Sequence, residues 1–343
     1  MTGCWLIAAF ALTVVAASSV AGDEPAQSSG ILQTPGLALA GDLQPVHDPA
    51  IIKHQNRYHL FSTSHVGEEP GLVHWRVSDD LRTWRRGGAV FDSIPAWALD
   101  YALDARGVWA PDIIHASGEY RLYYSVSSFG KNASAIGLAA NATLDPSDER
   151  FGWIDRGLVF FSREGDDFNA IDPNLLIDAE GRHWLSFGSF WTGLKMIAID
   201  PESGLPAEKQ PTLHSLARRP SPGAVEAPFI IERGGYYYLF ASFDFCCRGA
   251  ASTYYTVVGR ASSPTGPYVD RDGVGMMAGG GSVVLHAGQD PTERFFGPGH
   301  VAILRDGGAD YIVHHAYDAR RGGAPTLRIR KLEWTQDGWP RAR

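Results

Sequence analysis

The stretch DPAIIKHQNRYHLF, from Asp48 to Phe61, decides the fold because its pattern returns four more times along the chain. In each copy an apolar triplet is followed by a turn and then by a Tyr- or Trp-rich strand. The other copies are APDIIHASGEYRLYY from Ala110, DPNLLIDAEGRHWLSF from Asp172, APFIIERGGYYYLF from Ala227 and HVAILRDGGADYIVHH from His300. They begin 62, 62, 55 and 73 residues apart. Two strands per copy, with room for two more, predict five four-stranded blades and therefore an all-β, five-bladed β-propeller.

Polar residues recur at the first position of these copies. Asp48, Asp172 and His300 begin three of them, and Glu226 comes one residue before Ala227 in a fourth. Equivalent positions on the innermost strands of a propeller face the same central channel, so we expect three carboxylates and a histidine to converge. A single Asp-Pro would be ordinary turn chemistry. Burying several like charges together costs free energy, which predicts a bound cation or a reaction at this place.

The ends of the chain divide it into three predicted parts. Residues 1–22 have an apolar run that ends in Ser19-Val20-Ala21 and are predicted to be a signal peptide, although no Lys or Arg precedes the run. An uncleaved membrane anchor is the alternative, and the short run argues against it. Residues 23–41 are interpreted as a leader segment and 42–343 as the catalytic propeller. The mature chain is therefore expected to be secreted or periplasmic, free of the membrane and monomeric.

The amino-acid composition limits the kinds of molecule that the protein is expected to bind. The net charge is −8 with acids and bases interspersed, so no basic stripe is available for a phosphate backbone and nucleic acid is not expected as a partner. The chain has 10 Trp and 13 Tyr, more Trp than an average domain needs, and the strands of a propeller are expected to absorb most of these rings as core. Some of these rings are therefore candidates for stacking on sugars.

Cysteine usage leaves one question open. Cys4 would leave with the signal peptide, so Cys246 and Cys247 remain next to each other. Adjacent cysteines lie closer than normal disulfide geometry allows, and a bond between them would impose an unusual turn. A vicinal disulfide and two free thiols are both compatible with an oxidising compartment. No Cys/His spacing indicates a zinc site.

The converging carboxylates suit hydrolysis of a glycosidic bond, which needs one acid to protonate the leaving oxygen and one carboxylate to activate water or attack carbon. Asp48 and Glu226 belong to different blades, and carboxylates opposed across a channel leave room for a water molecule, which favours inversion. Asp172 would raise the pKa of Glu226 by like-charge repulsion. The alternative is that Asp172 only accepts a hydrogen bond from a backbone turn.

Several motifs resemble one family, the arabinanases of glycoside hydrolase family 43, over nearly the whole mature chain. They are HDPAII at His47, WAPDI at Trp109, SSFGKNASAIGLA at Ser127, AIDPNLL at Ala170, FGSFWTGLK at Phe187, VEAPFI at Val225, SFDFCCRG at Ser242 and GPGH at Gly297. The resemblance implies a five-bladed propeller that inverts the anomeric centre, with Asp48 as general base, Glu226 as general acid and Asp172 as the carboxylate that tunes and orients.

The resemblance also implies further site residues. His300 would ligate a metal, read as one calcium ion in the central cavity with water completing its shell. Trp109 and Phe129 would contact sugar, and Ser189 would line the groove as a polar contact. Asp112, in WAPDI, is offset by two residues from the channel position and is interpreted as structural.

The implied function is cleavage of α-1,5-L-arabinofuranosidic bonds in arabinan, with endo action as the main prediction. An exo-acting arabinanase, an α-L-arabinofuranosidase or a β-xylosidase of the same family is the alternative. The stretches Ser93 to Gly107 and Asp200 to Gly223 could build a wall that blocks one end of the groove. A carbohydrate-binding propeller without turnover would have lost one of the three acids, and all three are present.

Overall fold

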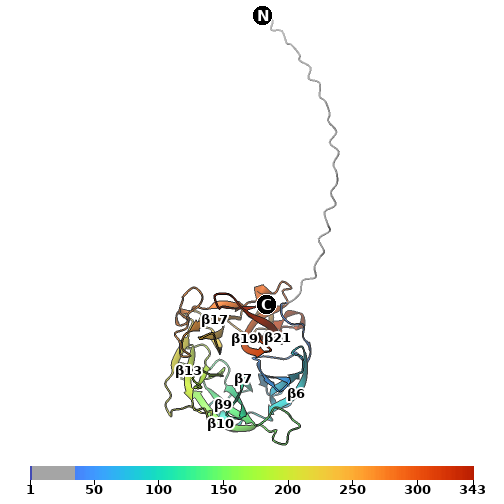
Figure 1. The fold of residues 1–343 in the computed structure, drawn as a ribbon, viewed down its shortest axis with the longest axis vertical. Coiled ribbons are helices and arrows are strands. Elements are labelled where there is room, and N and C mark those ends of the chain that lie inside the picture. The colour runs from blue at the N-terminus through green and yellow to red at the C-terminus, as the bar shows by residue number, and fades with distance from the viewer. Residues whose placement is uncertain (2–34) are drawn as a thin grey trace. The chain divides into compact units, whose positions relative to one another are not determined.

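The structure, a computed structural model, describes Met1 and residues 35–343, and the propeller occupies the latter range (Figure 1). The predicted signal peptide and most of the predicted leader lie outside the described residues. Five sheets form the five blades, and all their strand pairs are antiparallel except the short pair of β1 and β6, which confirms the predicted all-β, five-bladed β-propeller.

Each repeat of the sequence supplies the first two long strands of one blade. Blade 1 consists of β1 (Ala40–Gly41), β2 (Ala50–His54), β3 (Arg57–Ser62), β5 (Leu72–Ser78) and β6 (Thr83–Phe91), and blade 2 of β4 (Ser64–His65), β7 (Gly107–Ala116), β8 (Glu119–Ser127), β9 (Ser134–Asn141) and β10 (Ile154–Ser162). Blade 3 consists of β11 (Asn174–Ile177), β12 (His183–Phe187), β13 (Leu194–Ile199) and β14 (His214–Ala217). Blade 4 consists of β15 (Val225–Arg233), β16 (Tyr236–Phe243), β17 (Tyr255–Ala261) and β18 (Ser282–Leu285). Blade 5 consists of β19 (Phe295–Asp306), β20 (Ala309–Asp318), β21 (Ala324–Trp334) and β22 (Pro340–Ala342).

Short 3₁₀ turns lie between the strands and within the connections. They are η1 (Ala96–Asp100), η2 (Gly249–Ala251), η3 (Met276–Ala278), η4 (Ala287–Gln289) and η5 (Ala319–Arg321). Across residues 35–343, no helix is long and apolar enough to cross a membrane.

The first strands of the blades form the inner ring. β2 contacts β7, β7 contacts β11, β11 contacts β15, β15 contacts β19, and β19 contacts β2 again. The innermost strands therefore surround one axis, as the repeat predicts. Two of the turns that join first to second strands are Gly-Gly pairs with positive φ at both residues, Gly234-Gly235 and Gly307-Gly308. That conformation matches the twist of a tight hairpin and is open to glycine at little cost.

The apolar core is divided among the blade interfaces. Five clusters of buried side chains each join two neighbouring blades, and the cluster of blades 1 and 5 joins Leu60 and Trp84 to Leu327 and Ile329. All four of these side chains are almost fully buried. Because each face of a sheet packs on the next sheet, the strands bury apolar residues on both faces, and the axis stays free for polar groups.

An N-terminal segment fastens blade 1 to blade 5. Its backbone hydrogen-bonds β21 at three places, Leu37 N to Ile329 O (2.8 Å), Leu327 N to Leu43 O (3.0 Å) and Val46 N to Pro325 O (3.0 Å). β1 in the same segment pairs with β6 at the outer edge of blade 1. The ordered sheet thus begins two residues before the expected boundary at residue 42, because these residues bridge two blades.

The connections alternate between the two faces of the ring, because successive strands of a blade run in opposite directions. Ser93 to Gly107 lies on the face where the first strands begin, in keeping with the expected wall. The segment from Asp200 to Leu213 joins β13 to β14 on the opposite face, where the Ser117 hydroxyl donates to Pro201 O (2.7 Å). Only residues 218–224 return to the first face, so the expectation that the whole Asp200 to Gly223 stretch could wall the groove was wrong.

Candidate active site

The first residue of each repeat has the same backbone conformation in all five blades. The φ angles are positive at Asp48 (50°), Ala110 (44°), Asp172 (59°), Ala227 (56°) and His300 (49°). Left-handed backbone is costly for residues other than glycine, so a fivefold repetition marks a built feature of the inner ring. The positions that the repeat aligns are therefore equivalent in space, and Glu226 immediately precedes the fourth of them.

In four blades the N–H of this residue donates to a side chain at the end of the second strand of the preceding blade. The bonds are Ala110 N to Thr63 Oγ1 (2.8 Å), Asp172 N to Ser125 Oγ (3.0 Å), His300 N to Ser242 Oγ (2.9 Å) and Asp48 N to His315 Nδ1 (3.2 Å). A buried backbone donor without a partner would cost free energy, so this ring of bonds holds the blades together at the axis.

Blade 3 has no such acceptor for the first residue of blade 4, because the corresponding position is Gly188, which has no side chain. A Cβ there would lie 2.7 Å from Gly193 O, and φ is +131°. The Oδ2 atom of Asp172 accepts the Ala227 N–H instead, at 3.1 Å. Asp172 therefore does bond a backbone N–H, as the alternative interpretation held, and that N–H belongs to the residue next to Glu226.

Asp48 is buried and accepts hydrogen bonds from three side chains. Thr63 donates to Oδ2 (2.6 Å), His47 Nδ1 lies 2.8 Å from Oδ2, and His300 Nδ1 lies 3.0 Å from Oδ1. Burial raises the pKa of Asp48, but the charges and hydrogen bonds of His47 and His300 outweigh it and hold the pKa well below its usual range. Asp48 is therefore an ionised carboxylate, as a general base must be.

Asp172 and Glu226 are shifted in the opposite direction. Burial, joined by the charges of Glu226 and Asp48, raises the pKa of Asp172 to about 8. Burial also raises the pKa of Glu226, although hydrogen bonds from Ser189 (2.8 Å to Oε2) and Tyr254 work against it. Repulsion from Glu226 raises the pKa of Asp172, whereas the carboxylate that raises the pKa of Glu226 is Asp48, so the effect predicted for Asp172 on Glu226 acts on Asp172 instead. Near neutral pH the pair retains a proton that can be donated.

His300 stands between the acids. Burial lowers its pKa, but Asp48 and the other two carboxylates raise it to about 9. Nδ1 is bonded to Asp48, so Nε2 is the nitrogen that remains for a cation, after loss of its proton. Calcium prefers six to eight oxygen ligands, and within residues 35–343 no group of three potential ligand residues includes His300. The residues therefore fit only an ion whose shell is mostly water.

The remaining predicted site residues lie in different settings. Trp109 precedes Ala110 and so occupies in blade 2 the position that Glu226 has in blade 4, whereas Phe129 lies at the tip of the β8–β9 hairpin with 81% of its surface exposed. Ser189 donates to Glu226, so its hydroxyl is a partner of that carboxyl rather than only a groove contact. Asp112 accepts the Leu175 N–H (2.7 Å) and links blade 2 to blade 3, in keeping with a structural role.

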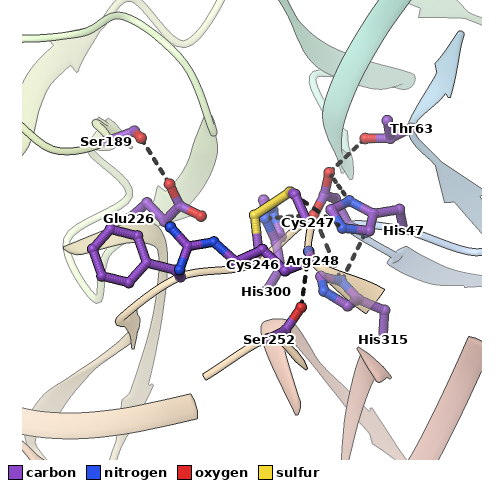
Figure 2. The surroundings of a disulfide bond; sticks show 12 residues. His47, Thr63, Ser189, Glu226, Cys246, Cys247, Arg248, Ser252, His300 and His315 are labelled. Carbon is purple, nitrogen blue, oxygen red and sulfur yellow. Dashed lines mark hydrogen bonds and ion pairs between the residues drawn. A yellow bond between two sulfur atoms is a disulfide. The ribbon is translucent and has the colours of Figure 1, made fainter. Parts of the chain in front are cut away.

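Cys246 and Cys247 form a vicinal disulfide, the alternative that the sequence left open. The bond lies in the β16–β17 connection, and Figure 2 shows it in the view between Glu226 and His47. Cys247 Sγ is 3.9 Å from His47 Nε2, and Cys247 is exposed. The disulfide therefore forms part of the surface beside the acids.

Sequence reasoning missed His47, Thr63, Tyr254, His315 and Tyr317. His47 stacks on His315 (ring centroids 4.0 Å apart), and Tyr254 is stacked on the other side of His315 (5.9 Å). His47 precedes Asp48 as Glu226 precedes Ala227. An alignment of the repeats that began one residue earlier would therefore have identified His47. Thr63 and His315 share a position in the repeats as well, but Tyr254 and Tyr317 reach the site from outside the repeated pattern.

A propeller with an ionised carboxylate on blade 1 and proton-retaining carboxyls on blades 3 and 4, all at one axis, has the architecture of a glycoside hydrolase. Residues 43–340 match the model of the glycosyl hydrolases family 43, and the chain belongs to that family. An extracellular endo-α-(1→5)-L-arabinanase of Bacillus subtilis is 42% identical over 299 residues, which is 86% of this chain and 87% of that protein.

One further relative and one solved structure are similar to this chain over nearly the same length. An extracellular exo-α-(1→5)-L-arabinofuranosidase of Cellvibrio japonicus is 40% identical over 316 residues, covering 89% of this chain and 88% of the relative. The solved structure of an endo-arabinanase from Bacillus licheniformis has a TM-score of 0.80 and 43% identity, covering 89% of this chain and 99% of that one. The likeness thus extends over the whole propeller.

Proposed function

We propose that the protein is an inverting, endo-acting arabinanase that cleaves α-1,5-L-arabinofuranosidic bonds. The observation that carries the proposal is the opposite protonation of carboxyls on opposed blades, with Asp48 held ionised and Glu226 and Asp172 shifted toward the protonated form. The names of the family 43 relatives supply the sugar and the linkage.

In the proposed reaction Asp48 takes a proton from a water molecule that attacks the anomeric carbon, and Glu226 gives its proton to the departing oxygen. Asp172 bonds the Ala227 N–H and so orients the residue that follows Glu226. Inversion follows because the water and the leaving group occupy opposite faces of the ring. The Thr63 hydroxyl orients the Asp48 carboxylate, and the Ser189 hydroxyl orients the Glu226 carboxyl.

The substrate is an arabinan chain or an arabino-oligosaccharide, with Trp109 and Phe129 as the proposed sugar-contacting rings. Flat rings suit the apolar face of a pentose, and the exposed Phe129 leaves a contact to be made. A calcium ion with His300 as its one protein ligand is part of the proposal, and its charge would offset that of the acids. The mature enzyme is proposed to be a monomer. It is proposed to work outside the cytoplasm, because both relatives are named as extracellular proteins.

Exo action is the second candidate, because one relative named as exo-acting is nearly as similar as the endo-acting one. The wall that would decide between them lies on the active-site face. There the Lys131 ammonium on the β8–β9 hairpin lies 3.3 Å from the Asp104 carboxylate in the Ser93 to Gly107 connection. This ion pair joins the β8–β9 hairpin of blade 2 to the connection that precedes this blade.

The test is a time course of products from debranched, linear α-1,5-arabinan, with xylan and an aryl arabinofuranoside beside it. An early ladder of mixed oligomers is expected for endo action. A single short product from the first minutes would move the assignment to exo action. Release from xylan or from the aryl glycoside alone would overturn the substrate while retaining the catalytic acids.

A further inference from the structure

A chain of hydrogen bonds runs from the disulfide to Asp48. The Cys247 N–H donates to the Tyr317 hydroxyl oxygen (2.8 Å), and the same oxygen lies 2.7 Å from His47 Nε2. The other ring nitrogen of His47 lies 2.8 Å from Asp48 Oδ2. Tyr317 thus contacts both the disulfide-bonded turn and the histidine beside Asp48.

The direction of each bond follows from the donors available. A backbone N–H can only donate, so the Tyr317 oxygen accepts from Cys247, and toward a neutral His47 with a free Nε2 lone pair its own hydrogen can be donated to that nitrogen. In either protonation state that bonds Asp48, His47 Nδ1 carries the proton that is donated to the carboxylate, and Nε2 faces the Tyr317 hydroxyl. Tyr317 in this way fixes the orientation of the His47 ring that bonds the carboxylate.

The surroundings leave Tyr317 little freedom. Its ring is buried at 3% exposure, and a Cβ on Gly297, where φ is +57°, would lie 2.9 Å from ring atom Cδ2. The first glycine of the GPGH motif therefore makes room for Tyr317. A Cβ on Gly299 would lie 2.3 Å from the Tyr254 ring, so the second glycine makes room for the tyrosine that bonds Glu226.

We propose that Tyr317 is a positioning residue that transmits the conformation of the Cys246–Cys247 turn to Asp48, so that turnover depends on the oxidation state of this disulfide. The inference rests on the proposed role of Asp48 as general base. A dithiol reductant supplies two electrons and two protons, becomes a cyclic disulfide, and leaves two free thiols. The freed turn no longer holds the Cys247 N–H on Tyr317, and the Tyr317–His47–Asp48 chain loses its fixed end.

The experiment compares the wild type with Tyr317→Phe, each oxidised and treated with dithiothreitol, on linear arabino-oligosaccharides. Tyr268→Phe is the matched control, because Tyr268 is equally buried and its hydroxyl donates to Pro264 O (2.7 Å) in blade 4. A chain that begins after residue 22 has no cysteines besides Cys246 and Cys247, so a thiol count reports this bond alone. We expect Tyr317→Phe to lower kcat by about tenfold or more with KM within about twofold, since misplacement of a catalytic group acts on the chemical step.

Reduction of the wild type is expected to lower kcat in the same way, and reduction of Tyr317→Phe to add little, because both changes break one chain. Two released thiols with unchanged kcat in the wild type would overturn the proposal, as would independent, multiplicative effects. The reduction arm needs no variant, so it decides the matter if Tyr317→Phe fails to fold. If the oxidised wild type does not cleave arabinan, the proposed function fails, and the same comparison is made on whichever aryl glycoside it cleaves.

Discussion

Replacing Asp172 by Asn tests the electrostatics of the site without removing the hydrogen bond to blade 4. The amide keeps an oxygen that can accept the Ala227 N–H, which the carboxylate accepts at 3.1 Å. It removes a carboxyl whose pKa burial raises to about 8 from an ordinary value of 3.8. The variant therefore isolates the cost of ionising this group inside the channel.

The sign and size of the change in unfolding free energy follow from the linkage between protonation and folding. Because the folded pKa lies above the unfolded one, the native state binds an extra proton between about pH 4 and pH 8. The stability that this group contributes is complete below the unfolded pKa and is lost as pH rises through the folded one. The loss is about 1.4 kcal/mol per pH unit, so the Asp172→Asn variant should gain on the wild type by about 3 kcal/mol between pH 5 and pH 7.

Urea unfolding of both proteins at pH 5, 6 and 7, followed by tryptophan fluorescence, measures the difference. Asp112→Asn is the matched control, since burial raises the pKa of Asp112 only to about 6 and its gain should level off above that pH. A stability difference for Asp172→Asn that does not change with pH would refute the reasoning, because Asp172 would then be ionised throughout. The same variant should lower kcat and shift the acid limb of its pH profile, and an unchanged profile would reduce Asp172 to a structural link.

Four other substitutions give separate outcomes. Asp48→Ala and Glu226→Ala should each lower kcat by about 10²- to 10⁴-fold while the propeller still folds, and near-wild-type turnover in either variant would remove that residue from the mechanism. His300→Ala, or chelation of the wild type, should lower activity or melting temperature, and indifference to both would argue against the proposed cation. Gly188→Ala should destabilise the fold by about 2–4 kcal/mol, because its Cβ would lie 2.7 Å from Gly193 O, and an unchanged urea midpoint would show that the β12–β13 connection relaxes freely.

The repeated pattern predicted the number of blades and the inner strands because each copy contains its own turn and its own apolar triplet. It predicted the convergence of Asp48, Asp172, Glu226 and His300 for the same reason, since equivalent positions in a repeat occupy equivalent places around an axis. These inferences required no knowledge of contacts between distant residues.

The partners of those residues could not be read in the same way. Tyr254 and Tyr317 reach the acids through packing across blades, and their places depend on the space that Gly297 and Gly299 leave. The prediction that Asp200 to Gly223 could wall the groove was wrong because the face of the propeller on which a connection lies depends on the number of strands that precede it in the blade. One missed strand in such a count moves a loop to the other side of the ring.

The hydrogen bonds between the N-terminal segment and β21 determine when, during synthesis, the ring of blades can close. Leu37 can meet Ile329 only after almost the whole chain has been made, because the two residues lie at opposite ends of the sequence. Four blades can stack on their neighbours as they emerge, whereas the seam between the first and the last must wait. Until then the apolar faces of blades 1 and 5 stay uncovered, and the carboxylates of the axis remain open to water. The channel can therefore be completed only after the last blade has been delivered.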